Sequence, residues 1–242
     1  MRAPGFGALF GGAALFLLLL TATAAPQAAT LRVAVAANFK PTLEGLNRAF
    51  EAETGHRILL SSASTGTLST QISAGAPFDL FFAADQASVT RLEAAGLTGS
   101  ARSVCYAVGR LVLAGGDDLG QLANPGLSLA IANPAVAPYG RAATQVLARP
   151  EFAGGAARKL VRGSSVAQAY QFWHSGSTDL GLLPASLAAG IDVPEAWHAP
   201  IEQYAVTLPR RASETAAAEY LDWIRGEQAQ ALIIAAGYRP CS

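Results

Sequence analysis

Residues 31–50 read LRVAVAANFKPTLEGLNRAF and contain a strand, a junction and a helix in immediate succession. Residues 31–37 form a short apolar run rich in valine, which is typical of a strand covered on both faces of a sheet. After Asn38, apolar residues recur at helical spacing as far as Phe50, and Pro41 stands in the first turn, where proline is tolerated. This stretch predicts a buried strand that passes straight into a helix.

The same alternation continues along the chain. Further strands are predicted over residues 57–62, 78–84, 127–132, 159–161, 180–183 and 204–208, with an extended segment over 106–113. Further helices are predicted around residues 68–72, 89–95, 140–147 and 166–173, followed by one long helix over 216–232. Alternating strands and helices indicate an α/β protein with mostly parallel sheets. We expect two such halves, joined near residues 105–110 and again near 202–208.

The first 29 residues have the pattern of a secretory signal peptide. Arg2 is followed by an apolar run and then by a stretch of small residues. Cleavage is expected after Ala24 or nearer Ala29. The alternative is a membrane anchor, because the apolar run approaches spanning length.

Composition excludes several classes of protein. The chain has 242 residues with 17 basic and 17 acidic side chains, so it lacks the positive balance of a nucleic-acid binder. With 51% hydrophobic residues it is too apolar to be disordered.

Two cysteines, Cys105 and Cys241, are a candidate disulfide if the chain is exported to an oxidising compartment. The alternative is two unrelated buried thiols. The cysteines and the three scattered histidines (His56, His174 and His198) do not have the spacing of metal ligands, so no metal site of protein ligands is predicted.

Small or hydroxyl-bearing residues stand at four predicted strand-to-helix junctions. These junctions are Ala37-Asn38, residues 64–67 (STGT), residues 138–140 (PYG) and residues 164–166 (SSV). Such junctions expose unpaired backbone N–H groups at the positive end of a helix dipole, and this arrangement binds anions. The alternative is that Asn38, Thr65 and Ser164 are ordinary helix caps.

Five strings resemble the periplasmic molybdate-binding proteins of ABC transporters. They are residues 35–39 (VAANF), 61–68 (SSASTGTL), 71–85 (QISAGAPFDLFFAAD), 132–141 (ANPAVAPYGR) and 168–172 (QAYQF), and the resemblance covers about residues 31–237. It implies a type II periplasmic-binding fold, with lobe I formed by residues 30–107 plus 207–242 and lobe II by residues 108–206. The resemblance also implies a monomeric periplasmic receptor without enzymatic activity or cofactor, which delivers molybdate or tungstate to a membrane permease.

The resemblance places the ligand contacts on Ala37, Asn38, Thr65, Tyr139 and Val166, with the backbone N–H serving at the last two. The metal of the oxyanion would be held through its oxygens by these residues. Some members of the family have a tyrosine hydroxyl donor in the segment that reads GLLPA here (residues 181–185). Pro184 has neither hydroxyl nor N–H, so one donor is expected to come from elsewhere, with Asn38 as the candidate.

A site of neutral donors favours a fully deprotonated oxyanion, and size is expected to separate molybdate and tungstate from sulfate. Lys40 and Arg141 flank two junctions and are read as solvated helix-surface charges that add long-range attraction at most.

Two alternatives remain. One is a receptor for another oxyanion such as sulfate or phosphate. The other is an exported hydrolase using Ser61, His56 and Asp79, although the chain has no Gly-x-Ser-x-Gly elbow and His56 is expected at the surface.

Overall fold

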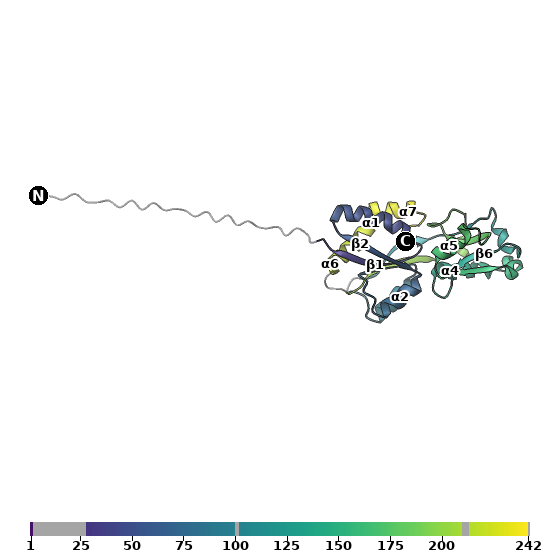
Figure 1. Cartoon of the computed structure of the whole chain (residues 1–242), viewed down its shortest axis with the longest axis horizontal. Helices are drawn as coiled ribbons and strands as arrows, with labels where there is room; N and C mark the ends of the chain where they lie inside the picture. The colour runs from purple at the N-terminus through teal and green to yellow at the C-terminus, as the bar shows by residue number, and fades with distance from the viewer. Residues whose placement is uncertain (2–27, 100–101, 210–212, 242) are drawn as a thin grey trace.

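The computed structural model describes residues 28–99, 102–209 and 213–241, together with Met1. Across these residues the chain forms two five-stranded sheets flanked by helices, one in each half of the elongated molecule (Figure 1). The predicted signal peptide lies almost wholly outside the described residues. Within the described part, no helix is long and apolar enough to cross a membrane.

The first lobe is built on a sheet with strand order β2-β1-β3-β10-β4. Its strands are β1 (Thr30–Ala36), β2 (Arg57–Ala63), β3 (Leu80–Ala83), β4 (Val104–Gly109) and β10 (Ile201–Thr207). Its helices are α1 (Lys40–Thr54), α2 (Thr65–Ser73), α3 (Gln86–Ala94), α6 (Glu214–Arg225) and α7 (Glu227–Ala235). Strand β10 runs antiparallel to both of its neighbours, so the other four strands are parallel to one another.

The second lobe repeats this plan with strand order β7-β6-β8-β5-β9. Its strands are β5 (Leu111–Ala114), β6 (Leu129–Ala132), β7 (Leu160–Gly163), β8 (Leu180–Pro184) and β9 (Ile191–Asp192). Its α-helices are α4 (Pro138–Leu147) and α5 (Val166–His174), and its short 3-10 helices are η1 (Leu119–Ala123), η2 (Pro150–Ala157) and η3 (Glu195–Trp197). Here β5 is the antiparallel strand.

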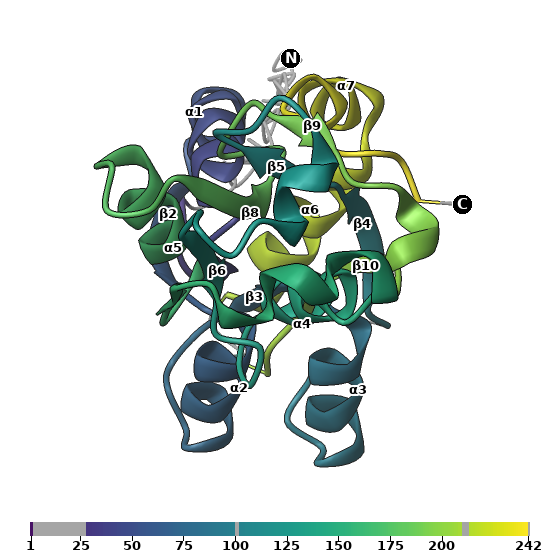
Figure 2. The ribbon, with the colours of Figure 1, turned by 90° about the vertical axis from the view of Figure 1, so that its right-hand side faces the viewer.

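The alternation of side chains along β1 fixes which helices cover which face of the first sheet. Leu31, Val33 and Val35 are fully buried in the core shared with α1, α6 and α7. Ala34 points to the opposite face, where it joins the core shared with α2 and α3. Figure 2 shows α1 and α7 on one side of the molecule and α2 and α3 on the other. Burying each large apolar side chain contributes about 1.5–3 kcal/mol, so this pattern determines the layering.

Two crossings join the lobes. The predicted extended segment over 106–113 is in fact two strands in different sheets, with Arg110 between β4 and β5. The return crossing precedes Ile201, because β10 pairs with β3 and β4 of the first sheet. It therefore lies earlier than the expected boundary at residue 207.

The prediction of a single helix over residues 216–232 was wrong. Gly226 adopts an extended conformation (ψ 154°) and separates α6 from α7.

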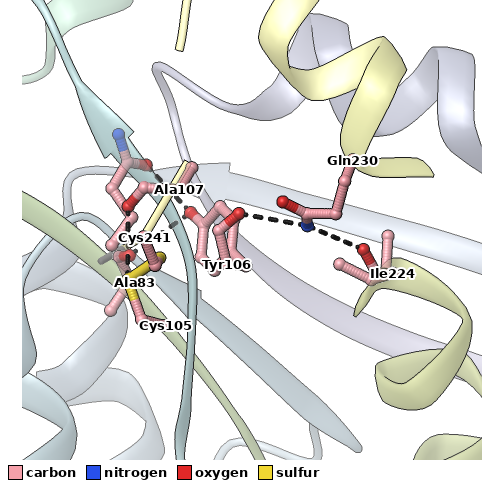
Figure 3. The surroundings of a disulfide bond; sticks show 8 residues. Ala83, Cys105, Tyr106, Ala107, Ile224, Gln230 and Cys241 are labelled. Carbon is pink, nitrogen blue, oxygen red and sulfur yellow. Dashed lines mark hydrogen bonds between the residues drawn. A yellow bond between two sulfur atoms is a disulfide. The ribbon is translucent and has the colours of Figure 1, made fainter. Parts of the chain in front are cut away.

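The disulfide between Cys105 and Cys241 is confirmed, with a Cα–Cα distance of 6.1 Å. It ties the C-terminal segment to β4, where the backbones of Val108 and Arg239 exchange hydrogen bonds of 2.8 and 2.9 Å. Figure 3 shows Tyr106 beside this bridge, with its carbonyl oxygen accepting from the Gln230 side chain over 3.2 Å. The chain terminus is thereby held next to the crossing strands.

Candidate functional site

A small pocket lies between the two lobes. Its walls come from the β1–α1 junction, the end of β3 and the N-termini of α2, α4 and α5. The lining residues are Ala36, Ala37, Asn38, Ser64, Thr65, Ala84, Ala137, Pro138, Tyr139 and Val166. The structure therefore brings all five sequence-predicted ligand residues into one place, and every residue that lines the pocket is uncharged.

The pocket is small. Its volume is about 10 Å³, which is room for about one water molecule. A tetrahedral oxyanion has four oxygen atoms around its centre and needs more space. The pocket must therefore widen to admit such an ion, and separation of the two lobes that form its walls would widen it.

Three helices begin at this pocket. In α2, α4 and α5 the first intrahelical hydrogen bond is donated by the fourth residue of the helix. Thr65, Tyr139 and Val166 come before the fourth residue of their helices. Their N–H groups therefore have no acceptor within their own helix. They also lie at the positive ends of three helix dipoles, one from the first lobe and two from the second. This arrangement attracts an anion without any formal positive charge.

Thr65 adds a hydroxyl donor. Its Oγ1 accepts a 3.0 Å hydrogen bond from the backbone N–H of Ala84, which orients the hydroxyl. The residue is 2% exposed, and its O–H proton is left for another acceptor. Because Thr65 lines the pocket, its hydroxyl can donate that proton to a bound ligand.

The side chain of Asn38 is bonded within the protein. Its side-chain Nδ2 donates to Gln203 Oε1 over 2.8 Å and to the Tyr238 hydroxyl over 3.1 Å. An amide nitrogen carries two protons, so both side-chain donors are engaged within the protein. The side chain is therefore not free to donate to a ligand in this structure, and a contact from Asn38 would have to come from its backbone N–H.

The segment around Pro184 contributes indirectly. Pro184 ends β8, opposite Leu111 in β5. Two residues later, the Ser186 hydroxyl donates to the carbonyl oxygen of Asn38 over 3.0 Å. The second lobe thus contacts the β1–α1 junction beyond the proline.

Further contacts cross the cleft or neutralise charges near it. Arg141 in α4 forms an ion pair with Asp85, which also caps α3 by accepting from Ser88 N. Lys40 pairs with Glu44 one turn along α1. Both cations are roughly half exposed and already paired, and exposed pairs of this kind are each worth about 0–1 kcal/mol.

Two residues of the hydrolase alternative, His56 and Asp79, are occupied elsewhere. His56 is 6% exposed rather than at the surface, and its ring nitrogens contact Ala29 N and Glu219 Oε2. Asp79 accepts from the backbone N–H of Arg32 and from the Ser213 hydroxyl. In the described part of the chain, no group of three or more His, Cys, Asp or Glu residues has the geometry of a metal site.

Three residues of the site were missed by the sequence interpretation, namely Gln203, Tyr238 and Ser186, which all bond to Asn38. They lie between 148 and 200 positions from Asn38 in the chain. No local motif marks them, so only the folded arrangement reveals them.

Comparison with known proteins identifies the family. Residues 31–239 match the family described as bacterial extracellular solute-binding protein. The molybdate-binding protein ModA of Azotobacter vinelandii is 40% identical over 230 residues, which is 88% of this chain and 91% of that protein. This chain belongs to the ModA family of solute-binding proteins. ModA of Rhodobacter capsulatus is 35% identical over 92% of this chain and 93% of its own length.

The three-dimensional match agrees with this membership. The periplasmic molybdate-binding protein of Azotobacter vinelandii superimposes with a TM-score of 0.83 at 35% sequence identity, over 88% of this chain and all of that one. The two-lobed periplasmic-binding fold is therefore that of a ModA protein. Proteins of this family bind solutes and are not enzymes.

Proposed function

We propose that this protein captures molybdate, and also tungstate, in the pocket between its lobes. The observation that supports the proposal is the composition of the pocket, which has only uncharged lining residues but receives helix N-termini from both lobes. In the proposed complex, the ion is held by the backbone N–H groups of Asn38, Tyr139 and Val166 and by Thr65. Ala37 forms the wall beside them.

The donor set explains the preferred ion. A fully deprotonated oxyanion offers only acceptors, so every donor finds a partner. An anion that keeps a proton would place a donor against a donor and leave a buried group unsatisfied, at a cost of about 1–3 kcal/mol. Molybdate and tungstate have nearly the same radius and charge and are expected to bind alike. Sulfate is smaller and spans fewer donors.

The proposed biological role is that of a periplasmic receptor. Residues 1–29 act as a signal peptide, and the mature protein works as a monomer that delivers its ion to an ABC transporter permease. The ion enters between separated lobes, and hinge motion about the two crossings then closes them. The relatives named molybdate-binding protein support this role.

Isothermal titration with molybdate, tungstate, sulfate and phosphate tests the proposal. We expect stoichiometric binding of molybdate and tungstate with similar affinities, and much weaker binding of the other two anions. Equal or tighter binding of sulfate would assign the pocket to a different oxyanion. Absence of binding by all four would remove the proposal, and turnover of an ester or phosphate substrate would favour a hydrolase.

A further inference from the structure

A buried polar cluster lies beneath the pocket, at the junction of the lobes. We call it the hinge cluster and define it as Asn38, Tyr106, Tyr139, Gln203 and Tyr238. Each of these residues is 3% exposed or less, and Gln203 is fully buried. They come from the β1–α1 junction, β4, α4, β10 and the C-terminal segment, so the cluster joins elements that are remote in sequence.

Gln203 is the member that links the lobes through its carboxamide. Its Oε1 accepts from Asn38 Nδ2 over 2.8 Å and from the Tyr106 hydroxyl over 2.9 Å, both in the first lobe. Its Nε2 donates to the Tyr139 hydroxyl of the second lobe over 3.2 Å. One side chain therefore contacts the two residues whose backbone donors face the pocket from opposite sides.

The backbone around Gln203 is shaped for these contacts. The pairing of β10 with β4 shifts register between Gln203 and Tyr204, and such a bulge redirects a side chain. Across the ladder, a Cβ atom on Gly109 would lie 2.1 Å from the Tyr139 hydroxyl oxygen and 2.8 Å from Gln203 Nε2. Glycine is therefore required where the tyrosine and the carboxamide meet.

A second set of contacts fixes the peptide at Asn38. The Tyr238 hydroxyl lies 2.8 Å from the carbonyl oxygen of Asn38 and 3.0 Å from the Ser186 hydroxyl. Ser186 belongs to the second lobe, so the orientation of the Asn38 backbone also depends on both lobes. The N–H of Asn38 is thus held in position when the lobes are together.

We infer that Gln203 is a positioning residue that couples closure of the lobes to the alignment of the anion donors at Asn38 and Tyr139. This inference rests on the proposed function. When the lobes separate, the hydrogen bond between Gln203 and Tyr139 breaks. When they close, that bond brings both backbone donors to the geometry that the ion needs. Donors that contacts within the protein align on closure need less ordering by the ion itself.

Two substitutions of Gln203 test this coupling, with molybdate affinity measured by isothermal titration between about pH 5.5 and 8.5. Gln203→Leu removes all three hydrogen bonds, and we expect affinity to fall at least about tenfold at every pH. Gln203→Glu has the same shape. When protonated, its carboxyl group still accepts from Asn38 and donates to Tyr139.

The glutamate variant gives a readout that a purely structural role would not produce. Burial raises the pKa of a carboxyl group, so this one is expected to ionise within the measured range. Ionisation removes the donor and places a negative charge near the anion. We therefore expect near-normal affinity at the acidic end and a loss of at least about tenfold toward the alkaline end. The titratable groups that contact Gln203 are Tyr106 and Tyr139, and burial raises the pKa of both, so they stay neutral throughout.

Gln230→Glu is the matched control. Gln230 is a partly buried glutamine of the first lobe that donates to the carbonyl oxygens of Tyr106 and Ile224, with no contact to the pocket. We expect its molybdate affinity to remain independent of pH, as in the wild type. Tyr139→Phe is a milder second variant, because it keeps the backbone donor and loses only the hydroxyl. We expect it to weaken binding roughly threefold to tenfold.

The outcomes separate this inference from the proposed function. If the wild-type protein fails to bind molybdate, both are lost. If the wild type binds and the Gln203 and Tyr139 variants bind equally well at all pH values, the function stands and the positioning role of Gln203 is overturned.

Discussion

The backbone N–H of Gly66 in α2 donates to the carbonyl oxygen of Val136, just before α4, over 2.9 Å. Gly66 belongs to the first lobe and Val136 to the second, so this hydrogen bond spans the cleft beside the pocket. A Cβ atom on Gly66 would lie 3.1 Å from both Val136 Cα and Val136 O. The two backbones thus approach so closely that a side chain at position 66 would press against Val136.

Gly66→Ala is expected to weaken anion binding without harming the fold. Alanine is the better helix former by about 1 kcal/mol, so the free energy of unfolding of the open protein should not fall. In the closed form the methyl group meets Val136, and overpacking of this kind costs about 1–3 kcal/mol. Titration with molybdate and thermal unfolding without ligand measure the two effects separately.

Gly45→Ala is the control for this substitution. Gly45 also lies in a helix of the first lobe, but the nearest atom to its added Cβ is the flexible end of Arg48, at 3.8 Å. Its affinity should equal that of the wild type. Equal affinities for Gly66→Ala and Gly45→Ala would show that the contact with Val136 plays no part in closure.

Removing the Thr65 hydroxyl is expected to weaken binding more strongly than it affects stability. A hydrogen bond to a charged group contributes about 1.5–3 kcal/mol, so Thr65→Ala should reduce molybdate affinity by that amount. The variant also leaves Ala84 N–H without its acceptor, which lowers stability somewhat. Thr65→Ser keeps the hydroxyl and should bind nearly as the wild type does. Unchanged affinity in Thr65→Ala would mean that Thr65 only accepts the hydrogen bond from Ala84 N and does not bind the ion.

The residues of the pocket could be predicted from sequence because each wall is a strand-to-helix junction formed by residues that are neighbours in the chain. Thr65, for example, follows β2 and begins α2, and the strand-to-helix transition is visible in the residues themselves. The motifs of the family then indicated which junctions converge.

The support beneath the pocket could not be predicted in this way. Gln203 and Asn38 are 165 positions apart, and their contact depends on a β-bulge and on the exact path of β10. The role of the Asn38 side chain was missed for the same reason, because its partners were not visible. The break at Gly226 was missed because the apolar periodicity continues on both sides of it.

Loss of the disulfide is expected to destabilise the protein and loosen the site. Cys105 and Cys241 are 136 positions apart, and closing so long a loop in the unfolded chain contributes about 2–5 kcal/mol to the free energy of unfolding. Cys241→Ser should therefore lower the denaturation midpoint in urea. Affinity for molybdate should also fall, because the bridge holds the segment that carries Tyr238 beneath Asn38.

Reducing agent provides the control for the cysteine variant. Dithiothreitol should lower the stability of the wild-type protein toward that of Cys241→Ser and leave the variant unchanged. A variant with full stability would mean that the backbone pairing of Arg239 with Val108 suffices to hold the C-terminal segment.

Alkaline pH is expected to destabilise the folded protein through its buried tyrosines. Burial raises the pKa of Tyr106, Tyr139, Tyr220 and Tyr238 above the ordinary value of about 10. Above that pH the unfolded chain loses phenolic protons that the folded chain retains, so the free energy of unfolding falls as pH rises. Below about pH 9 these groups are protonated in both states and contribute no pH dependence.

Urea unfolding between about pH 8 and 11 measures this effect, with each retained proton contributing up to about 1.4 kcal/mol per pH unit. Tyr238→Phe removes one of these protons and should reduce the slope above pH 10 accordingly. The same variant deletes a hydroxyl that contacts Asn38, so its molybdate affinity should be lower even at neutral pH. A slope identical to that of the wild type would mean that Tyr238 ionises equally easily in the folded and unfolded chains, which contradicts its burial at the junction of the lobes.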